Sequence, residues 1–371
     1  MDLAVTAGGT GPGDLDLVYR QWERQHERRA NFLGYPVNLD VDYRVFGELL
    51  DILWITVGDP SNGYHARLDL QPFEREVVRF LARVAGADPD HTYGYVTSGG
   101  SESNLFGVHL GRERLPDAPL YYSAAAHYTV ERTARLLRME PVPVPAMRDG
   151  GIDVHALRAA CESRRGRGAV VVATVGTTVL GGIDSLAGVL RAVEPAGERH
   201  LHVDAALGGL VARFAAHRPA WGFDAGADSV AISGHKLIGT PIPCGVVLAR
   251  EEWVGTPAEV EYLSAADSTL ACSRNALAPA LLWYALRRLG QRGLAARVHR
   301  CLDTAEYAVE RLAAAGFRPW RNPASVTVVF ERPPEHLCRR WRLSTTGALA
   351  QLIAMPHVTR AMIDRFVADL R

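Results

Sequence analysis

Short apolar runs alternate with helical patterns from Tyr93 to about Arg250. Because strands that alternate with helices pair through crossover connections, this pattern predicts an α/β protein with a mostly parallel sheet. Such a sheet binds its ligands beyond the carboxyl ends of its strands. The predicted strands are Tyr93–Thr97, Leu120–Ser123, Ala169–Val175, His200–Asp204, Ser229–Ile232 and Gly245–Ala249.

Helices are expected between these strands. Ser101–Arg114 and Tyr128–Leu137 carry apolar residues at helical spacing, and Asp184–Val193 follows the break at Gly181-Gly182. Asp184 is a plausible N-terminal cap, because a carboxylate can accept hydrogen bonds from the free amides of a first turn.

Two further regions flank this core. The chain up to about Gly58 predicts a Gly-rich start, a helix near Leu15–Arg29 and an extended arm with Gly34-Tyr35-Pro36. After the core, the pattern predicts a long helix from about Ala278, a strand, a short helix, a second strand and a last helix; the strands are Ser325–Phe330 and Leu349–Met355, and the last helix begins at Thr359. We therefore expect an N-terminal helix and arm (1–58), a large α/β domain (59–277) and a small C-terminal α+β domain (278–371).

Composition narrows the class of partner. Lys+Arg and Asp+Glu balance at 41 each, so no overall basic field is available for nucleic acid or an anionic membrane. The first residues lack the pattern of a secretion signal, and no apolar stretch approaches the roughly 20 residues that span a bilayer. We expect a cytoplasmic protein with a small-molecule partner. The five scattered cysteines indicate reduced packing residues, with neither a disulfide framework nor a zinc site.

The chain contains one lysine, Lys236, in Ser233-Gly234-His235-Lys236 at the end of an apolar run. A partly desolvated lysine amine can lose its proton and attack a carbonyl, whereas arginine stays protonated. Retention of this one lysine favours nucleophilic chemistry. A surface charge or a phosphate contact is the alternative.

Asp204 closes another apolar run, in His202-Val203-Asp204-Ala205-Ala206, where an unpaired carboxylate would be costly. A pyridinium nitrogen is a suitable cationic partner, since pyridoxal phosphate bound to a lysine needs an acid that keeps its ring protonated. By itself, Asp204 could equally be a helix cap or a salt-bridge partner. Its conjunction with Lys236 favours the cofactor.

Three more motifs follow predicted strands. Ser98-Gly99-Gly100-Ser101-Glu102-Ser103-Asn104 joins a strand to a helix, where free amides could face a phosphate that Ser233 and His235 also contact. His127 could stack on an aromatic ring or act as an acid or base, although a single histidine is more often structural. Thr177-Thr178 follows a third strand. Together these strand ends offer a phosphate cradle, a stacking group, a ring-nitrogen acid and a Schiff-base lysine.

These motifs resemble those of the group II pyridoxal-phosphate-dependent amino-acid decarboxylases, in the branch of the histidine and serine decarboxylases. The similarity runs from about Gly34-Tyr35-Pro36 to the C-terminus. It includes Ala126-His127-Tyr128, Gly176-Thr177-Thr178, Pro241-Ile242-Pro243-Cys244-Gly245, Cys272-Ser273-Arg274-Asn275 and Val329-Phe330-Glu331-Arg332-Pro333. The resemblance implies the aspartate-aminotransferase type of fold (fold type I), a homodimer with active sites at the subunit interface, and decarboxylation of an L-amino acid to an amine and CO2.

The resemblance also implies roles for single residues. Lys236 would form the Schiff base with pyridoxal phosphate, and Asp204 would pair with the pyridine nitrogen. Ala206 and His127 would cover the two ring faces. Tyr262 would protonate the substrate carbon from a mobile loop. The remaining cofactor-binding positions would be Ser98, Gly99, Gly100, Thr177, Ser233 and His235.

Two departures from the family leave the substrate open. Family members commonly read Ser-Arg-Asn-Gly-His where this chain reads Ser273-Arg274-Asn275-Ala276-Leu277. The segment with Tyr64 and His65, where the family contacts substrate, also differs. Serine and histidine are candidates, and Leu277 could equally indicate an aliphatic substrate such as valine. Two other functions stay open, namely decarboxylation coupled to aldehyde formation or another carbanion reaction, and a silent homologue that serves only in binding or dimerisation.

Overall fold

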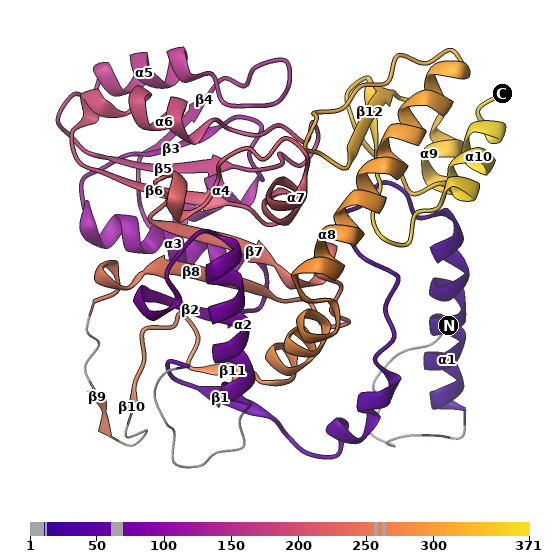
Figure 1. Ribbon diagram of the computed structural model, residues 1–371, viewed down its shortest axis with the longest axis horizontal. Coiled ribbons are helices and arrows are strands. Elements are labelled where there is room, and N and C mark those ends of the chain that lie inside the picture. Colours follow the sequence, from indigo (N-terminus) through magenta and orange to yellow (C-terminus); the bar gives the residue numbers. More distant parts are fainter. Residues whose placement is uncertain (1–10, 12, 61–69, 256–258, 262–264) are drawn as a thin grey trace.

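The structure is a computed structural model that describes residues 11, 13–60, 70–255, 259–261 and 265–371. Its centre is a seven-stranded sheet in the order β2-β8-β7-β6-β5-β3-β4 (Figure 1). The strands are β2 (Thr92–Thr97), β3 (Leu120–Ser123), β4 (Pro141–Val144), β5 (Ala169–Thr174), β6 (Arg199–Asp204), β7 (Ser229–Ser233) and β8 (Gly245–Arg250). Strand β8 pairs antiparallel with β7 and with β2, and the other pairs are parallel.

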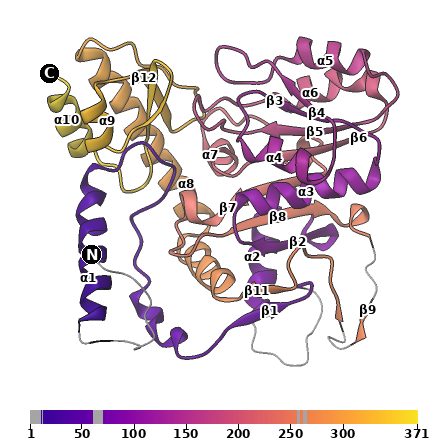
Figure 2. The ribbon, with the colours of Figure 1, turned by 180° about the vertical axis from the view of Figure 1, so that it is seen from behind.

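Helices cover both faces of this sheet (Figures 1 and 2). Val170 and Val172 of β5 pack in one core cluster with α3 (Gly100–Arg114) and α4 (Thr129–Leu136). The alternate residues of β5 pack in a second cluster with the helices of the opposite face, α2 (Gln71–Val84), α5 (Val154–Glu162), α6 (Leu186–Ala192), α7 (Gly208–Phe214) and α8 (Leu277–Ala314). Burial on both faces explains why β5 is a continuous apolar run.

A smaller antiparallel sheet lies toward the C-terminus. It has the order β12-β14-β13, with β12 (Thr327–Glu331), β13 (Ser344–Thr346) and β14 (Leu349–Ile353). Helices α9 (Glu335–Arg340) and α10 (Arg360–Asp369) accompany it, and α8 runs from the central sheet toward it (Figure 1). Two short ladders complete the described strands: β1 (Ile55–Val57) with β11 (Ser273–Asn275), and β9 (Glu259–Val260) with β10 (Ala265–Ala266).

The N-terminal segment crosses the molecule. Helix α1 (Asp14–Arg28) has no buried residue and lies at the edge that carries the C-terminal helices (Figures 1 and 2). The arm that follows is tied to those elements, because Leu33 donates its amide to the Trp341 carbonyl and accepts from the Ile353 amide. The arm then continues past the strand ends of the central sheet, where it contributes to the site described below.

The predicted fold class is confirmed, and so are the six predicted strands of the central sheet. The sequence patterns missed β4, α2, α5 and α7. The N-terminal cap of α6 was predicted wrongly: Ser185 caps the helix by accepting from the Gly188 amide at 3.2 Å. Asp184 is buried instead and accepts from the amides of Ile152 (2.6 Å) and Thr174 (2.7 Å). The predicted domain boundaries stay a prediction.

Two expectations from composition can be compared with the structure. The five cysteines are free thiols; four are buried packing residues, whereas Cys272 is exposed and was wrongly expected to be one. In the described parts of the chain, the helices are too short or too polar to cross a bilayer, and clusters of residues able to hold a metal ion are absent.

Candidate functional site

A cavity of about 280 Å³ opens at the carboxyl ends of β2, β5, β6 and β7. The antiparallel strand β8 separates β2 from β7, so β2 runs in the same direction as the parallel strands and ends at the same edge. The sequence placed its motifs at strand ends, and the fold brings most of them to this cavity. The predicted residues that line it are Ser98, Gly99, Gly100, His127, Asp204, Ala206, Ser233, His235 and Lys236.

Lys236 lies in a π-helical turn, Gly234–Ile238, directly after β7. Its own backbone is not helical (φ −81°, ψ −109°), and irregular turns of this kind are frequent at functional sites. Distant segments bind the carbonyls that the turn leaves free: Asn38 donates to Leu237 (3.3 Å) and Arg297 donates to Ile238 (2.6 Å). The arm and α8 therefore hold the lysine in place.

The environment of Lys236 favours its neutral amine. Burial lowers the pKa of the amine below its usual range, and the carboxylate of Asp204 opposes this effect. A lowered pKa increases the fraction of unprotonated amine near neutral pH, which is the nucleophilic form.

Asp204 ends β6, and its two oxygens have separate hydrogen-bond donors. Oδ2 accepts from Asn104 Nδ2 at 2.9 Å, and Oδ1 accepts from the Ala206 amide at 3.1 Å. These bonds hold the carboxylate at the base of the cavity. A carboxylate oxygen can accept more than one hydrogen bond, so the group can still receive a cationic N–H from a ligand.

His127 lies in the turn between β3 and α4. Its Nδ1 is 2.7 Å from Thr129 Oγ1, which fixes the ring relative to the start of α4. Burial lowers the pKa of the imidazole; Asp204 raises it, and Lys236 lowers it further. A largely neutral imidazole on the cavity wall is suited to stacking against an aromatic ring.

The part of the cavity lined by Ser98, Gly100, Ser233 and His235 offers groups that can hydrogen-bond the oxygens of a phosphate. Ser233 Oγ is buried and has no hydrogen-bond partner among the residues the structure describes. A Cβ on Gly100 would lie 2.9 Å from this oxygen, so glycine keeps the space above it open. His235 Nδ1 lies 2.8 Å from the Cys244 carbonyl, which leaves Nε2 for a ligand. Ser98 is already engaged, because its hydroxyl donates to Glu102 Oε2 at 2.6 Å.

Some predicted residues lie elsewhere. Thr177 is buried beside the cavity with its hydroxyl accepting from the Gly182 amide at 2.8 Å, and it is the neighbouring Thr178 that lines the cavity. Leu277 is half-buried as the first residue of α8 and does not line the cavity of its own chain. Three predicted residues lie outside the described residues, namely Tyr64, His65 and Tyr262.

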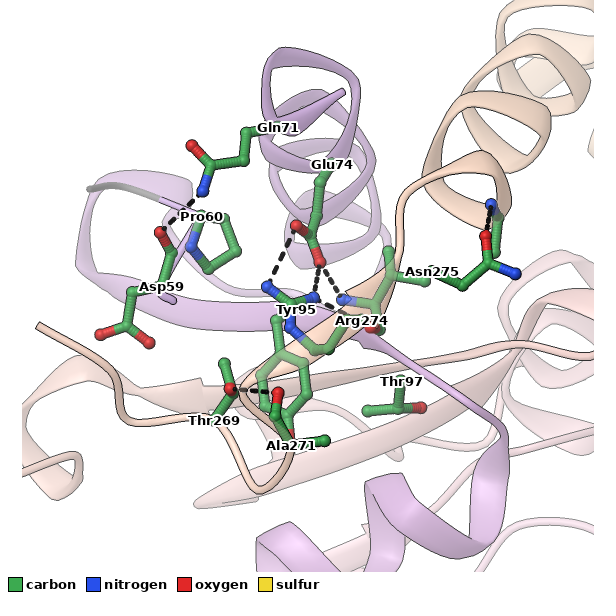
Figure 3. Close-up of polar contacts among 12 residues, drawn as sticks. Asp59, Pro60, Gln71, Glu74, Tyr95, Thr97, Thr269, Ala271, Arg274 and Asn275 are labelled. Carbon is green, nitrogen blue, oxygen red and sulfur yellow. Dashed lines mark hydrogen bonds and ion pairs between the residues drawn. The ribbon is translucent and has the colours of Figure 1, made fainter. Parts of the chain in front are cut away.

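A buried ion pair beside the site was not predicted from the sequence. Arg274 of β11 points at Glu74 of α2, with Nη1 and Oε1 2.5 Å apart (Figure 3). The guanidinium also donates to the Gly58 carbonyl at 2.8 Å, and Glu74 accepts from the Val96 amide at 2.7 Å. Nothing in local periodicity marks two residues this far apart as partners. The pair fixes the chain immediately before the segment 61–69.

A second feature missed from the sequence lies behind Asp204. His200 and His202 of β6 are fully buried on the face of the strand that also carries Asp204. Residues two apart share one face of a strand, so the sequence His200-Leu201-His202-Val203-Asp204 did contain this signal.

The cavity fits pyridoxal phosphate on these observations. It combines a desolvated amine, a carboxylate with room for a cationic N–H, a neutral imidazole on the wall and an unpartnered buried hydroxyl beside a glycine turn. Such a set of groups defines a pyridoxal-phosphate enzyme.

Comparisons with known proteins identify the family. Residues 74–331 match the pyridoxal-dependent decarboxylase conserved domain. The chain is 36% identical to a histidine decarboxylase of Pseudomonas fluorescens, over 96% of this chain and 91% of the relative. It is 40% identical to serine decarboxylase 1 of Oryza sativa subsp. japonica, over 93% of this chain and 72% of the relative. The chain therefore belongs to the group II pyridoxal-phosphate-dependent decarboxylases and is an amino-acid decarboxylase that uses pyridoxal phosphate.

Solved structures agree on the fold. The L-methionine decarboxylase of Streptomyces sp.590 superposes with a TM-score of 0.91 at 23% identity, over 99% of this chain and 96% of the other. Mouse CSAD superposes with a TM-score of 0.79 at 23% identity, over 100% of this chain and 89% of the other. These proteins share fold type I with this chain, as the sequence predicted.

Proposed function

We propose that the cavity at the strand ends is the decarboxylation site, in which Lys236 forms the Schiff base and Asp204 pairs with the ring nitrogen of pyridoxal phosphate. The observation that carries this proposal is the position of the chain's one lysine, with a lowered amine pKa, in the same cavity as Asp204. Bound pyridoxal phosphate supplies an electron sink for the carbanion that loss of CO2 would create.

The residues around the cofactor have distinct tasks in this proposal. Ser233 donates a hydrogen bond to the phosphate, and so does His235 Nε2 in the tautomer whose Nδ1 accepts from the Cys244 amide. The amides of Gly99 and Gly100 also donate to the phosphate, as does Ser98 once its hydroxyl leaves Glu102. His127 and Ala206 cover the two faces of the ring, so the ring is held in one plane. Tyr262 returns a proton to the substrate carbon. Thr178 takes the place beside the cofactor that the sequence had given to Thr177.

Serine and histidine are the proposed substrates. Relatives named for these two amino acids are 35–40% identical to this chain over most of its length. The argument for valine rested on Leu277, which does not line the cavity of its own chain. We infer that a second subunit brings Leu277 to the substrate, and that Tyr64 and His65 contact substrate as the family resemblance implies.

A homodimer accounts for the exposed N-terminal helix. Leu15, Val18, Tyr19 and Trp22 lie on one face of α1 and are each more than half exposed. An apolar stripe of this kind usually marks an interface. We infer that this helix packs on a second copy of the chain and that the active sites lie at the interface. Free thiols and pyridoxal-phosphate chemistry are consistent with the cytoplasm.

The test compares wild type with Lys236→Ala and Lys236→Arg. Wild-type protein should be yellow, lose its visible band on treatment with borohydride, and release the amine of serine or histidine when mass spectrometry surveys the twenty amino acids. Both variants should lack the band and turnover. Arginine keeps the positive charge but cannot form the imine, so it separates loss of charge from loss of the nucleophile.

Three results would count against the proposal. A normal absorption spectrum and full activity in either variant would exclude Lys236 as the Schiff-base residue. Valine as the preferred substrate would contradict the inferred specificity, and an aldehyde as the main product would favour the coupled reaction. Sedimentation as a monomer at assay concentration would exclude the homodimer.

A further inference from the structure

A series of hydrogen-bonded, buried side chains leads from the base of the cavity into the protein. Asn104 of α3, which donates Nδ2 to Asp204, places its Oδ1 3.0 Å from His202 Nε2. His202 Nδ1 lies 2.9 Å from Ser229 Oγ on the neighbouring strand β7. Asn104, His202 and Ser229 are each 3% exposed or less, so these bonds are shielded from water.

The series continues to the surface. Ser229 Oγ lies 3.1 Å from His200 Nε2, and His200 Nδ1 lies 3.0 Å from Arg114 Nη1 at the end of α3. The Arg114 guanidinium is stacked 3.4 Å above the Trp253 ring and lies 4.0 Å from Asp228 Oδ1. The series therefore begins at a partly exposed cation and ends at the acid in the cavity.

The carboxylate at the inner end of this series fixes the direction of the hydrogen bonds from Ser229 to Asp204. The carboxylate of Asp204 can only accept, so the Asn104 amide must donate and its Oδ1 must accept. His202 therefore carries its proton on Nε2. Burial, opposed by Asp204 and reinforced by His200, lowers the His202 pKa to about 3, so the ring is neutral and Nδ1 accepts from the Ser229 hydroxyl.

The hydrogen bonds from Arg114 to Ser229 have the same direction. The Ser229 hydroxyl donates its hydrogen bond to His202 Nδ1, so its oxygen accepts from His200 Nε2. Burial, reinforced by Arg114 and opposed by a backbone hydrogen bond to Gly107, lowers the His200 pKa to about 3. The neutral ring accepts at Nδ1 from the Arg114 guanidinium, which can only donate. All five bonds therefore point from Arg114 toward Asp204.

Helix α3 is shaped around the two imidazoles. A Cβ on Gly107 would lie 2.0 Å from His202 Nδ1, and a Cβ on Gly111 would lie 2.9 Å from His200 Cδ2. Glycine inside a helix is less favourable for stability than alanine. Buried polar groups add a further cost unless all are paired. An apolar core would need neither the helix glycines nor a complete set of paired donors and acceptors, so stability alone does not explain this arrangement.

We propose that Arg114, His200, Ser229, His202 and Asn104 form a one-way hydrogen-bond relay that orients Asp204 and keeps its carboxylate an acceptor for the ring nitrogen of the cofactor. This inference rests on the proposed pairing of Asp204 with that nitrogen. The five residues are positioning residues, since they act through Asp204. The polarity of the relay favours a proton on the ring nitrogen because every donor points toward the carboxylate.

The experiment removes the middle bond with Ser229→Ala and uses Ser123→Ala as the control. Ser123 is equally buried, at the end of β3, but its hydroxyl accepts from the Ala125 amide and takes no part in the relay. Nitrogen NMR of histidine-labelled protein, with and without the cofactor, reports the tautomer of His202. A second spectrum with ¹⁵N-labelled pyridoxal phosphate reports protonation of the ring nitrogen.

In wild type and in Ser123→Ala, His202 should show a protonated Nε2 and a bare Nδ1. In Ser229→Ala the two tautomers should mix, the labelled ring nitrogen should move toward its unprotonated position, and cofactor affinity and kcat should each fall about tenfold, the size expected for one hydrogen bond. Ser229→Thr, which keeps the hydroxyl, should restore the wild-type signals. Unchanged tautomer, ring-nitrogen signal and affinity in Ser229→Ala would overturn the relay.

A second variant tests the outer end if Ser229→Ala does not fold. Arg114→Met should change the His200 Nδ1 signal and weaken cofactor binding, whereas Arg112→Met on the same helix should do neither. If Arg114→Met leaves both readouts at wild-type values, the relay is refuted. Asp204→Asn separates this inference from the proposed function. Normal turnover in folded, cofactor-loaded Asp204→Asn would refute the pairing, whereas a slow Asp204→Asn beside a wild-type Ser229→Ala would refute the relay alone.

Discussion

The buried pair of Glu74 and Arg274 offers a stability prediction that the structure makes quantitative. Glu74→Gln removes the carboxylate charge but keeps an oxygen that can still accept from the Val96 amide. The Arg274 side chain, 5% exposed, would keep only neutral acceptors, the carbonyls of Val96 and Gly58. Breaking a buried pair in this way costs about 3–5 kcal/mol. That is a large part of the free energy of unfolding of a typical protein, which is roughly 5–15 kcal/mol.

The assay is urea unfolding followed by circular dichroism, with the free energy of unfolding compared between variants. The double variant Glu74→Leu/Arg274→Met removes both charges and should lose less than Glu74→Gln alone, because an apolar pair avoids desolvation. The control is Asp90→Asn, which breaks the exposed ion pair of Asp90 with Arg79. Arg79 lies on α2, as Glu74 does, and this variant should leave the unfolding transition unchanged.

The same change should affect substrate binding. Arg274 holds the Gly58 carbonyl, and the next residue, Asp59, accepts from Tyr93 Oη at 2.6 Å and from the Ser268 amide at 3.0 Å. These contacts fix the start of the segment that the sequence assigns to substrate. We expect a higher KM in Glu74→Gln with little change in cofactor affinity. A Glu74→Gln protein within 1 kcal/mol of wild type, or a double variant less stable than the single one, would refute this reasoning.

Three further predictions concern pH, substrate and proton transfer. His200 stays neutral in the fold, with its pKa lowered to about 3, whereas the unfolded chain takes up its proton below about pH 6.5; this stability is complete above pH 6.5 and is lost toward pH 3 by about 1.4 kcal/mol per pH unit. Burial raises the pKa of Asp184 to about 6, which has the opposite effect on the pH dependence of stability. His200→Gln should therefore make the free energy of unfolding fall less steeply toward acid pH than the control His155→Gln, which changes an exposed histidine. An equal slope in both variants would contradict the assignment. Leu277→His should shift relative rates among serine, histidine and valine, and constant ratios in active protein would place specificity elsewhere. Tyr262→Phe should slow amine formation by about 10²–10⁴ and raise the share of aldehyde, whereas wild-type amine yield and rate would assign the proton to another group.

The sequence determined the framework of the fold and the main groups of the site. Strands such as β5 are buried on both faces, so their continuous apolar runs are visible without any knowledge of packing. The carboxyl ends of strands that run the same way meet at one edge, so residues at those ends had to come together. Lys236, Asp204, His127 and Ser233 therefore reach one cavity as expected.

The tertiary structure decided which polar groups pair with one another. Glu74 meets Arg274, and Asn104 meets His202, across long stretches of chain that no local period connects. The same limit explains a smaller error: local capping rules suggested Asp184 as a helix cap, but the buried amides of Ile152 and Thr174 bind its carboxylate instead. Hydrogen-bond partners depend on which side chains a packed core leaves facing each other. Burial then makes those partners obligatory, since an unpaired polar group there has no water to replace its bond.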